Sequence, residues 1–465
     1  MGDTTEPRRR TVLQAAAGTA LATNVAGCLG DDDRTVEIAA GHPFEDADAE
    51  ILAALRDAGL DDDIEVSITT RSPDLTPVDQ HFRGFLESDR SSPELLVTDG
   101  SWTLPLIVDE LLAPVEDALP GSTIEHVEST SLPAALGTAT QPASGVLYGL
   151  PLTVDFPTIQ YRRDLVEEAG YDPEGENWST EPMTWQSFAE IVADVWDYHG
   201  GEDEYTYGFT TQAQAYEGLS CCTFYETMRS VGGAYFGGQL YGPVGDRPVT
   251  VDEPAVVEAV RMMRSFMYGP DTDDAASGYP QITTDDITEF DEEGAREPFT
   301  GGDALFMRNW PYTLEFHAEE ADFEVGTMPL PYGIEPDDAE YERAGGSCHT
   351  CSAQHLVLNP EAESREATLA VLEAFVDERV QRTILEVTGE LPPDPDVIGM
   401  ADPAALGALG DHLETLAVAA DRTIPQPGSV GWSDHSVAIR EAVHDAYTGE
   451  RTPAAALSEL ATKIE

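Results

Sequence analysis

The sequence predicts an α/β protein with more than one domain, and three observations support this. At 465 residues the chain exceeds the size at which one hydrophobic core usually suffices. Hydrophobic residues make up 41% of it, as in globular proteins. Near the N-terminus, alternating apolar runs and segments of helical periodicity follow in the order β-α-β-α-β. This order builds a mainly parallel sheet, whose ligands bind beyond the carboxyl ends of the strands.

The first predicted elements place three side chains at that edge. The strands and helices are, in order, 35–39, 46–58, 64–68, 78–87 and 94–98. Gly59 supplies a C-cap for the first helix, because glycine tolerates the left-handed backbone that ends many helices. His42 follows the first strand in a predicted loop, and Asp99 and Trp102 follow the third. We expect all three beside a ligand.

Glycines and prolines interrupt two apolar runs within residues 145–157 (GVLYGLPLTVDFP). Because these residues break regular elements, we expect the chain to pass between domains there. Later strands are predicted at 158–161, between the Gly301-Gly302 turn and Trp310, and at 355–358. Helices are predicted at 164–169, 185–197, 254–267 and 360–389, and others start at 433 and 453. Residues 271–297 are predicted to be mostly loop and surface helix.

The stretch 299–312 (FTGGDALFMRNWPY) is the most informative of these elements. Its apolar run predicts a buried strand that ends at Trp310, because Pro311 has no N–H for a sheet ladder. Trp310 and Tyr312 would then stand at a strand end, where a cleft between domains could use them. Packing of Trp310 in a core is the alternative.

The chain is strongly acidic, with a formal net charge of −64 and Lys463 as its only lysine. This charge excludes a protein that binds the phosphate backbone of nucleic acid. It suits a surface in high salt, where self-repulsion is screened. The composition resembles that of proteins from extremely halophilic archaea.

Residues 1–27 are predicted to be an export signal. The run RRRTVLQ at 8–14 resembles the twin-arginine motif, and the weakly apolar segment after it is too short to span a membrane. The sequence VAGC at 25–28 resembles a lipoprotein processing box, so Cys28 would carry lipid and residues 28–34 would be an acidic tether. An ordinary signal peptide with a chance cysteine is the alternative.

Taken together, eight stretches resemble one family, the extracellular solute-binding proteins of ABC importers of the maltose/trehalose type. In chain order they are 25–28, 145–165, 232–233, 301–312, 323–331, 345–347, 388–393 and 424–443. The resemblance implies a two-lobed, periplasmic-binding-protein-like type II α/β fold with a ligand cleft between the lobes. It also implies closure by a hinge motion that the permease reads.

We expect the chain to cross between lobes near 152–157, 303–309 and 353–359. The N-terminal lobe would then contain 35–154 and 308–354, and the C-terminal lobe 155–307 and 355–465. The implied function is capture of a di- or oligosaccharide outside the cell and delivery to the membrane subunits of the importer, with a lipid anchor and no cofactor or metal.

Sugars need charged acceptors for their hydroxyls and aromatic rings for their C–H faces. By resemblance, Asp155 is the hinge carboxylate, Trp310 the stacking aromatic, Tyr312 a weaker companion and Trp432 part of the C-terminal lining. The loops with His42, Asp99 and Trp102 carry sugar contacts in the family. The glycine pair of the 345–347 stretch, Gly345 and Gly346, either offers N–H groups to the ligand or turns the chain.

Four cysteines remain after Cys28, and an exported protein favours disulfides. We expect Cys221, Cys222, Cys348 and Cys351 to form local pairs, because a bridge between lobes would hinder closure. A bridge between the two clusters, free thiols and a zinc site at Cys348, His349 and Cys351 are the alternatives.

Two other functions compete with sugar import. An exported glycoside hydrolase needs two carboxylates, but 88 acidic residues make any pair easy to find. The sequence contains no nucleophile elbow, phosphate loop or HExxH motif, so we predict no enzyme. A binding protein for another solute, such as an organic anion or a metal complex, is the second alternative, which the scarcity of basic residues disfavours.

Overall fold

A computed structural model of the chain describes residues 34–70, 78–88, 90–237, 247–427 and 432–465. The signal expected at 1–27, the lipid-bearing Cys28 and the tether up to residue 33 lie outside these residues. From Arg34 onwards the chain forms one compact unit. Among its described helices, none combines the length and the apolar character that a membrane span requires.

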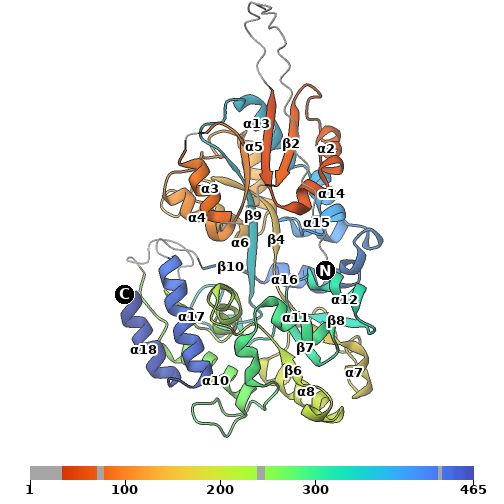
Figure 1. Cartoon of the computed structure of the whole chain (residues 1–465), viewed down its shortest axis with the longest axis vertical. Helices are drawn as coiled ribbons and strands as arrows, with labels where there is room; N and C mark the ends of the chain where they lie inside the picture. Colours follow the sequence, from red (N-terminus) through yellow and green to blue (C-terminus); the bar gives the residue numbers. More distant parts are fainter. Residues whose placement is uncertain (1–33, 71–77, 89, 238–246, 428–431) are drawn as a thin grey trace, which may run out of the picture. The chain divides into compact units, whose positions relative to one another are not determined.

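The first sheet contains six strands in the order β10-β9-β3-β1-β2, with β4 also paired to β9 (Figure 1). Their bounds are β1 (Thr35–Ala40), β2 (Glu65–Thr70), β3 (Leu95–Asp99), β4 (Gly149–Asp155), β9 (His349–Leu358) and β10 (Thr423–Pro425). Strands β1, β2 and β3 are parallel, as predicted. Strand β9 is antiparallel to both β3 and β4. Strands β3 and β4 therefore run in the same direction, and both end at the same edge.

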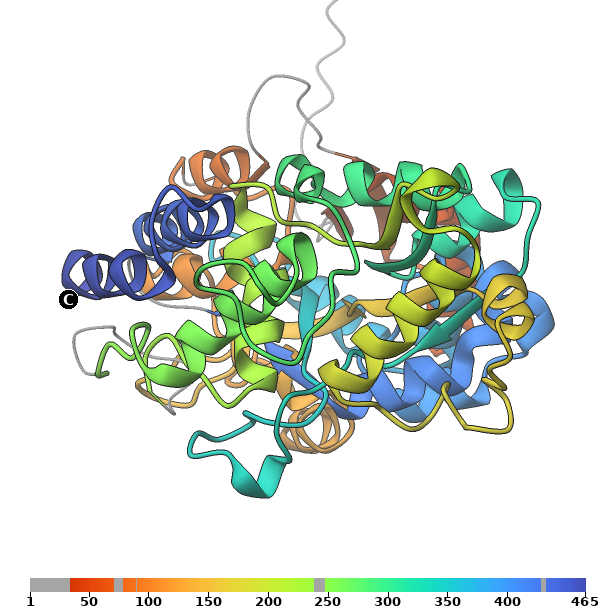
Figure 2. The same cartoon turned by 90° about the horizontal axis from the view of Figure 1, so that it is seen from below.

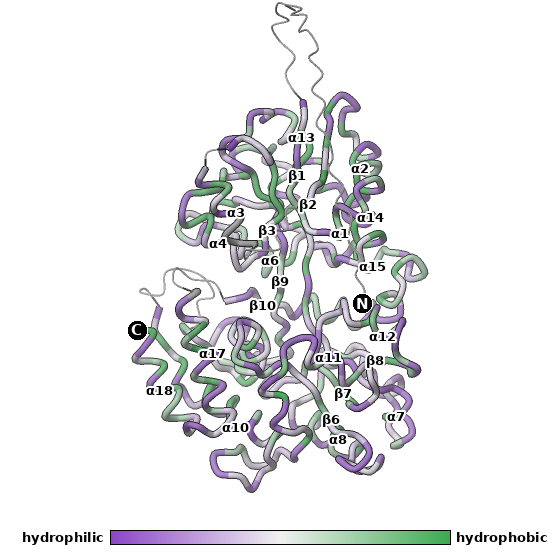
Figure 3. Tube along the Cα trace, in the orientation of Figure 1, coloured by the Kyte–Doolittle hydropathy of each residue, from purple (hydrophilic) through white to green (hydrophobic). Residues whose placement is uncertain are grey.

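Helices cover this sheet through apolar faces that pack with its strands into its core. They include α1 (His42–Asp46), α2 (Asp48–Asp57), α3 (Val78–Leu86), α4 (Gly100–Val108), α5 (Gly121–Thr130), α6 (Pro133–Ala139), α13 (Arg365–Phe375) and α14 (Glu378–Thr388). Along α2, hydrophobic and hydrophilic residues alternate, as a helix between core and solvent requires (Figure 3). Ile51 and Leu55 of that helix are fully buried.

The second sheet has the strand order β6-β7-β5-β8. Its strands are β5 (Thr158–Arg162), β6 (Tyr207–Thr210), β7 (Ala304–Asn309) and β8 (Val325–Met328). All six residues of β7 are buried, and the strand ends just before Trp310, as Pro311 predicts. The chain enters this sheet directly from β4 through Phe156 and Pro157.

A second core surrounds this sheet. It contains residues from α7 (Arg163–Glu168), α8 (Trp185–Tyr198), the π-helical turn η2 (Leu219–Thr223), α9 (Phe224–Ser230), α10 (Pro254–Tyr268), α11 (Glu292–Thr300), α17 (Trp432–Thr448) and α18 (Pro453–Ile464). Helices α17 and α18 lie side by side in both views (Figures 1 and 2). A third cluster joins residues of β4 and β9 to α12 (Thr313–Glu320), α15 (Pro395–Met400) and α16 (Leu413–Asp421).

Gly100 begins α4 directly after β3, since the Asp99 carboxylate accepts the Ser101 N–H at 2.8 Å and caps the helix. Two local predictions were wrong. His42 begins α1 instead of lying in a loop, because Pro43 suits the first turn of a helix. The single helix expected at 360–389 is two helices, because Asp377 caps a new one.

The expected division of the chain at 308 and 355 is also corrected. Strands β7 and β8 pair with β5, so residues 304–328 belong to the second sheet and not to the first. Helices α13 and α14 bury Leu372, Val380 and Ile384 in the core of the first sheet, although residues after 355 were expected in the other lobe. Both corrections follow from contacts between residues that are far apart in the sequence, strand pairing in the first case and helix packing in the second.

Buried His355 on β9 should make the fold sensitive to acid. Its Nε2 donates to the Ala135 carbonyl at 2.9 Å, and burial lowers its pKa to about 4. In the unfolded chain a histidine takes up its proton near pH 6.5, so the unfolded state binds more protons below that pH. Stability is therefore fully present above pH 6.5 and falls as the pH drops towards 4.

The test compares the wild type with His355→Gln in denaturant titrations from pH 7 to pH 4. We expect the stability of the wild type, relative to the variant, to fall by about 3 kcal/mol over this range. Comparison with the variant removes the contributions of the other histidines. A difference that does not change with pH would contradict the assignment.

Candidate functional site

Asp155 stands where the chain leaves the first sheet for the second. It is the last residue of β4 and lies opposite Ser352 of β9. Asp99 ends β3, which pairs with β9 and runs in the same direction as β4. The Asp99 carboxylate accepts the Ser352 hydroxyl at 3.1 Å. The structure therefore brings Asp99 and Asp155 to the same edge of the sheet, on either side of β9.

The Asp155 carboxyl is only partly exposed and poorly compensated. Its Oδ1 accepts the backbone N–H of Phe156 at 2.9 Å. Burial raises its pKa well above the usual value, and the carboxylate of Glu390 raises it further. The Phe156 N–H and the positive charge of Arg308 act in the opposite direction.

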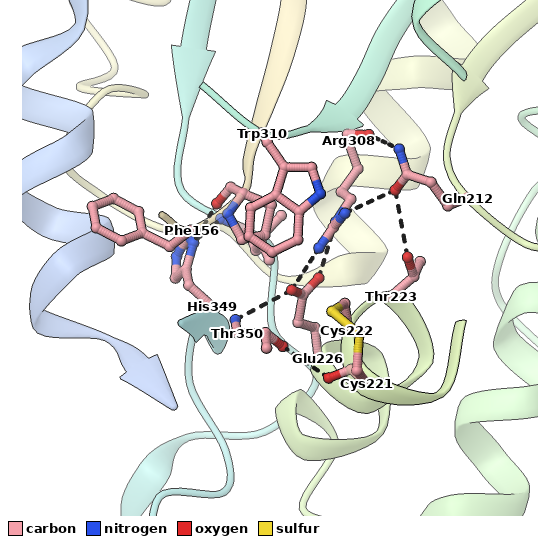
Figure 4. Close-up of polar contacts among 12 residues, drawn as sticks. Phe156, Gln212, Cys221, Cys222, Thr223, Glu226, Arg308, Trp310, His349 and Thr350 are labelled. Carbon is pink, nitrogen blue, oxygen red and sulfur yellow. Dashed lines mark hydrogen bonds and ion pairs between the residues drawn. A yellow bond between two sulfur atoms is a disulfide. The ribbon is translucent and has the colours of Figure 1, made fainter. Parts of the chain in front are cut away.

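Trp310 lies at the boundary of the second core, with 9% of its surface exposed. Its backbone is held in place, because the Trp310 carbonyl accepts hydrogen bonds from Gln160 and Thr313. The guanidinium of Arg308 lies 5.0 Å from the centre of the indole ring (Figure 4). Arg308 thus contacts Trp310 and also influences Asp155, which links the two predicted residues.

Arg308 is held by a buried ion pair with Glu226 of α9 (Figure 4). Its Nε and Nη2 donate to the two carboxylate oxygens of Glu226 at 3.0 and 2.6 Å. Its Nη1 donates to Gln212 at 2.8 Å. The pair is therefore bidentate. Its two side chains are only 3% and 4% exposed, so water is largely excluded from it.

Strand β9 is bonded to this network. The Thr350 N–H donates to Glu226 at 3.2 Å. The neighbouring His349 bonds through Nδ1 to the carbonyl of Pro157, in the link between β4 and β5, at 2.7 Å. The start of β9 therefore connects residues of the second sheet to the crossing that carries Asp155 (Figure 4).

Cys221 and Cys222 form a disulfide between adjacent residues on the η2 turn, with a Cα–Cα distance of 3.8 Å. The Cys221 carbonyl accepts the Thr350 hydroxyl at 3.5 Å, so this turn also borders the network. Cys348 and Cys351 are free and buried, so the second local pair expected there is not formed. No group of three or more histidine, cysteine or acidic residues among those described could hold a metal ion.

The other predicted site residues separate into different environments. Trp102 is half-buried in the first turn of α4. His42 lines a pocket of about 420 Å³ with Val387 and Thr388 of α14. Tyr312 is 39% exposed, and its hydroxyl donates to Glu293 at 2.8 Å.

Trp432 is buried in the second core, with its ring centre 6.2 Å from that of Tyr235. Gly345 and Gly346 have φ of 73° and 67° and turn the chain. Their N–H groups donate to the carbonyls of Arg229 and Ile334 at 2.8 and 2.7 Å. They are therefore not free for a ligand, and this part of the prediction was wrong.

A pocket of about 990 Å³ contains none of the predicted residues. It is an open depression beside β8, and its walls include Phe323, His412 and Thr415. We place the candidate site instead at Asp155, because its carboxyl has no ion-pair partner among the described residues and it stands at the crossing between the two sheets.

Sequence reasoning missed Glu226, Gln212 and Glu390. One signal was present for the ion pair, since Arg308 is the only charged residue of the buried strand β7 and such a charge needs a partner. Which acid supplies it depends on tertiary contacts.

The two free thiols should be unreactive in the native protein. Burial raises the pKa of Cys348 to about 12 and that of Cys351 as well, so neither forms a thiolate at neutral pH. With a Cys28→Ser variant, a thiol reagent should modify no cysteine of the folded chain, two after unfolding without reductant and four after reduction. Labelling of the folded chain would contradict both the burial and the pairing.

Comparisons with known proteins agree with this fold. A family model described as bacterial extracellular solute-binding protein matches residues 87–409. A protein of Deinococcus radiodurans named as a probable ABC transporter-binding protein is 28% identical over 226 residues, 46% of this chain. The match spans 48% of that relative, about half its length.

Solved structures resemble nearly the whole chain. Maltose-bound MalE3 of T. maritima has a TM-score of 0.67 at 24% identity, over 92% of this chain and 98% of its own. The cyclic α-maltosyl-1,6-maltose binding protein of Arthrobacter globiformis has a TM-score of 0.68 at 18% identity, over 92% and 97%. At these identities the likeness concerns the fold.

Proposed function

This chain belongs to the bacterial extracellular solute-binding proteins, and from that premise we propose that it captures a di- or oligosaccharide and delivers it to the permease of an ABC importer. The observation that carries the choice of ligand is the position of Asp155. This carboxyl ends β4 beside the crossing to the second sheet, near the Arg308 that contacts Trp310. A carboxylate and an indole are the two groups that a sugar's hydroxyls and C–H face require.

The solved relatives support a carbohydrate ligand in a limited way. One is bound to maltose, and another is a cyclic α-maltosyl-1,6-maltose binding protein. Members of the matched family are solute-binding proteins, which supports binding without turnover.

We also propose lipid anchoring at Cys28 after export by the twin-arginine route. The supporting observations are the RRRTVLQ run at 8–14 and the VAGC run at 25–28. Mass spectrometry of the protein from membranes would test this, because a diacylglycerol group on an N-terminal Cys28 changes its mass. An unmodified Cys28 would refute the anchor.

Calorimetric titration of the whole chain in high salt, over a panel of neutral sugars, tests the ligand class. We expect saturable binding to at least one sugar and no change of the sugar with time. Asp155→Asn should weaken binding at least about tenfold, because a neutral amide cannot make charge-assisted hydrogen bonds. Glu386→Gln, an exposed change on α14, is the matched control. Absence of binding across the panel would refute the proposal.

A further inference from the structure

Glu390 lies directly across from Asp155, although the sequence did not predict it as a site residue. The Val154 N–H donates to the Leu391 carbonyl at 2.8 Å, and these two residues form an isolated antiparallel bridge. Antiparallel register then pairs Asp155 with Glu390, with both side chains on one face. Like charges in such a pair repel each other.

No cation among the residues described here forms an ion pair with Asp155 or Glu390. Arg308 is the cation that acts on Asp155, but its guanidinium is already shared between Glu226 and Gln212. On the opposite side, Ser352 donates its hydroxyl to Asp99 rather than to Asp155. Among the described residues, no ion pair involves either Asp155 or Glu390.

A buried hydroxyl lies beside the same two carboxyls. Thr153 is 1% exposed, and it stands on the same face of β4 as Asp155 because side chains alternate along a strand. The Thr153 hydroxyl lowers the pKa of Glu390, so the two groups lie close together. The distances and angles around Thr153 Oγ1 nevertheless give it no hydrogen-bond partner among the described residues. A buried hydroxyl without a partner costs free energy, so it marks a place where a polar ligand group would be stabilised.

We propose that Asp155, Glu390 and Thr153 bind the ammonium group of an amino sugar. This inference rests on the proposed function and narrows its substrate class. An ammonium has three N–H donors, which match two carboxylates and one hydroxyl oxygen. Its positive charge also removes the repulsion between the two carboxylates, which a neutral sugar leaves in place. Among the residues that the structure describes, no group of three or more histidine, cysteine or acidic side chains here could hold a metal ion.

The experiment titrates the whole chain with matched pairs of sugars that differ in one amino group. The pairs are glucosamine and glucose, galactosamine and galactose, and the β-1,4-linked disaccharides of glucosamine and of glucose. The pH is about 6, where an amine of pKa near 8 is protonated. We expect the amino sugar of at least one pair to bind at least about tenfold more tightly than its neutral partner.

Two variants identify the residues responsible. Glu390→Gln and Thr153→Val should each reduce this preference towards equal affinity, and Glu386→Gln, on the exposed side of α14, should leave it unchanged. Thr153→Val keeps the volume of the side chain and removes only the acceptor. Circular dichroism would confirm that each variant is folded.

The outcomes separate the two levels of the proposal. Equal or weaker binding of the amino sugar in every pair, with neutral sugars still bound, overturns the amino-sugar inference and leaves the proposed function standing. A preference that survives both variants also overturns it. If no sugar of either kind binds, the proposed function falls and the inference falls with it.

Discussion

Glu226→Ala is expected to lower the free energy of unfolding by about 3–5 kcal/mol, because it leaves Arg308 buried without its counter-charge. Both side chains are almost fully buried, and the pair makes two direct hydrogen bonds. Unfolding in guanidinium chloride, whose ionic strength is high throughout, followed by circular dichroism, would measure the loss.

Two comparisons identify the mechanism. The double replacement Glu226→Met with Arg308→Met removes both charges and should cost much less than the single change. Glu441→Ala breaks the exposed pair between Glu441 and Lys463, whose atoms are 3.5 Å apart, and should cost less than about 1 kcal/mol. A small effect of Glu226→Ala, similar to that of Glu441→Ala, would mean that water reaches Arg308.

Trp310→Leu is expected to weaken sugar binding about 100-fold, on the proposed function, because leucine has no ring face for the sugar. An alanine at this position would be a poorer test. Trp310 is 9% exposed within the second core, so removing its bulk would cost about 3–5 kcal/mol of stability. Leucine retains part of the apolar volume.

The control is Trp196→Leu, which removes a ring from the same core. Trp196 is buried on α8, and its Nε1 donates to the Tyr205 carbonyl at 2.8 Å. We expect both variants to lose stability and only Trp310→Leu to lose affinity, as measured by thermal unfolding and calorimetry. Unchanged affinity in Trp310→Leu would assign this indole to core packing.

Much of the fold could be predicted because local sequence determines it. Alternating apolar residues located β1, β2 and β3, and Pro311 located the end of β7. The parallel order of the first strands placed Asp99 correctly at the edge of the sheet. These features depend on neighbours in the chain, which one sequence shows directly.

The remaining features depend on partners that are distant in the sequence. Arg308 meets Glu226 only because β7 packs against α9, and Asp155 meets Glu390 only through the bridge at Leu391. The expected lobe was wrong for residues 308–328 and for α13 and α14 for the same reason, since local sequence does not show which sheet a strand joins or a helix covers. Gly345 and Gly346 were correctly seen as a turn, but their N–H groups already have backbone partners.

The bonds at the start of β9 restrict how the two sheets could rotate relative to each other. The Thr350 N–H donates to Glu226, and His349 donates to the Pro157 carbonyl. Moving the start of β9 away from the second sheet would therefore break both hydrogen bonds. A rotation of one sheet relative to the other about an axis close to Thr350 would preserve both bonds. Residues farther from that axis would move over larger distances. The buried pair of Glu226 and Arg308 would then stay in place while the outer parts of the two sheets move.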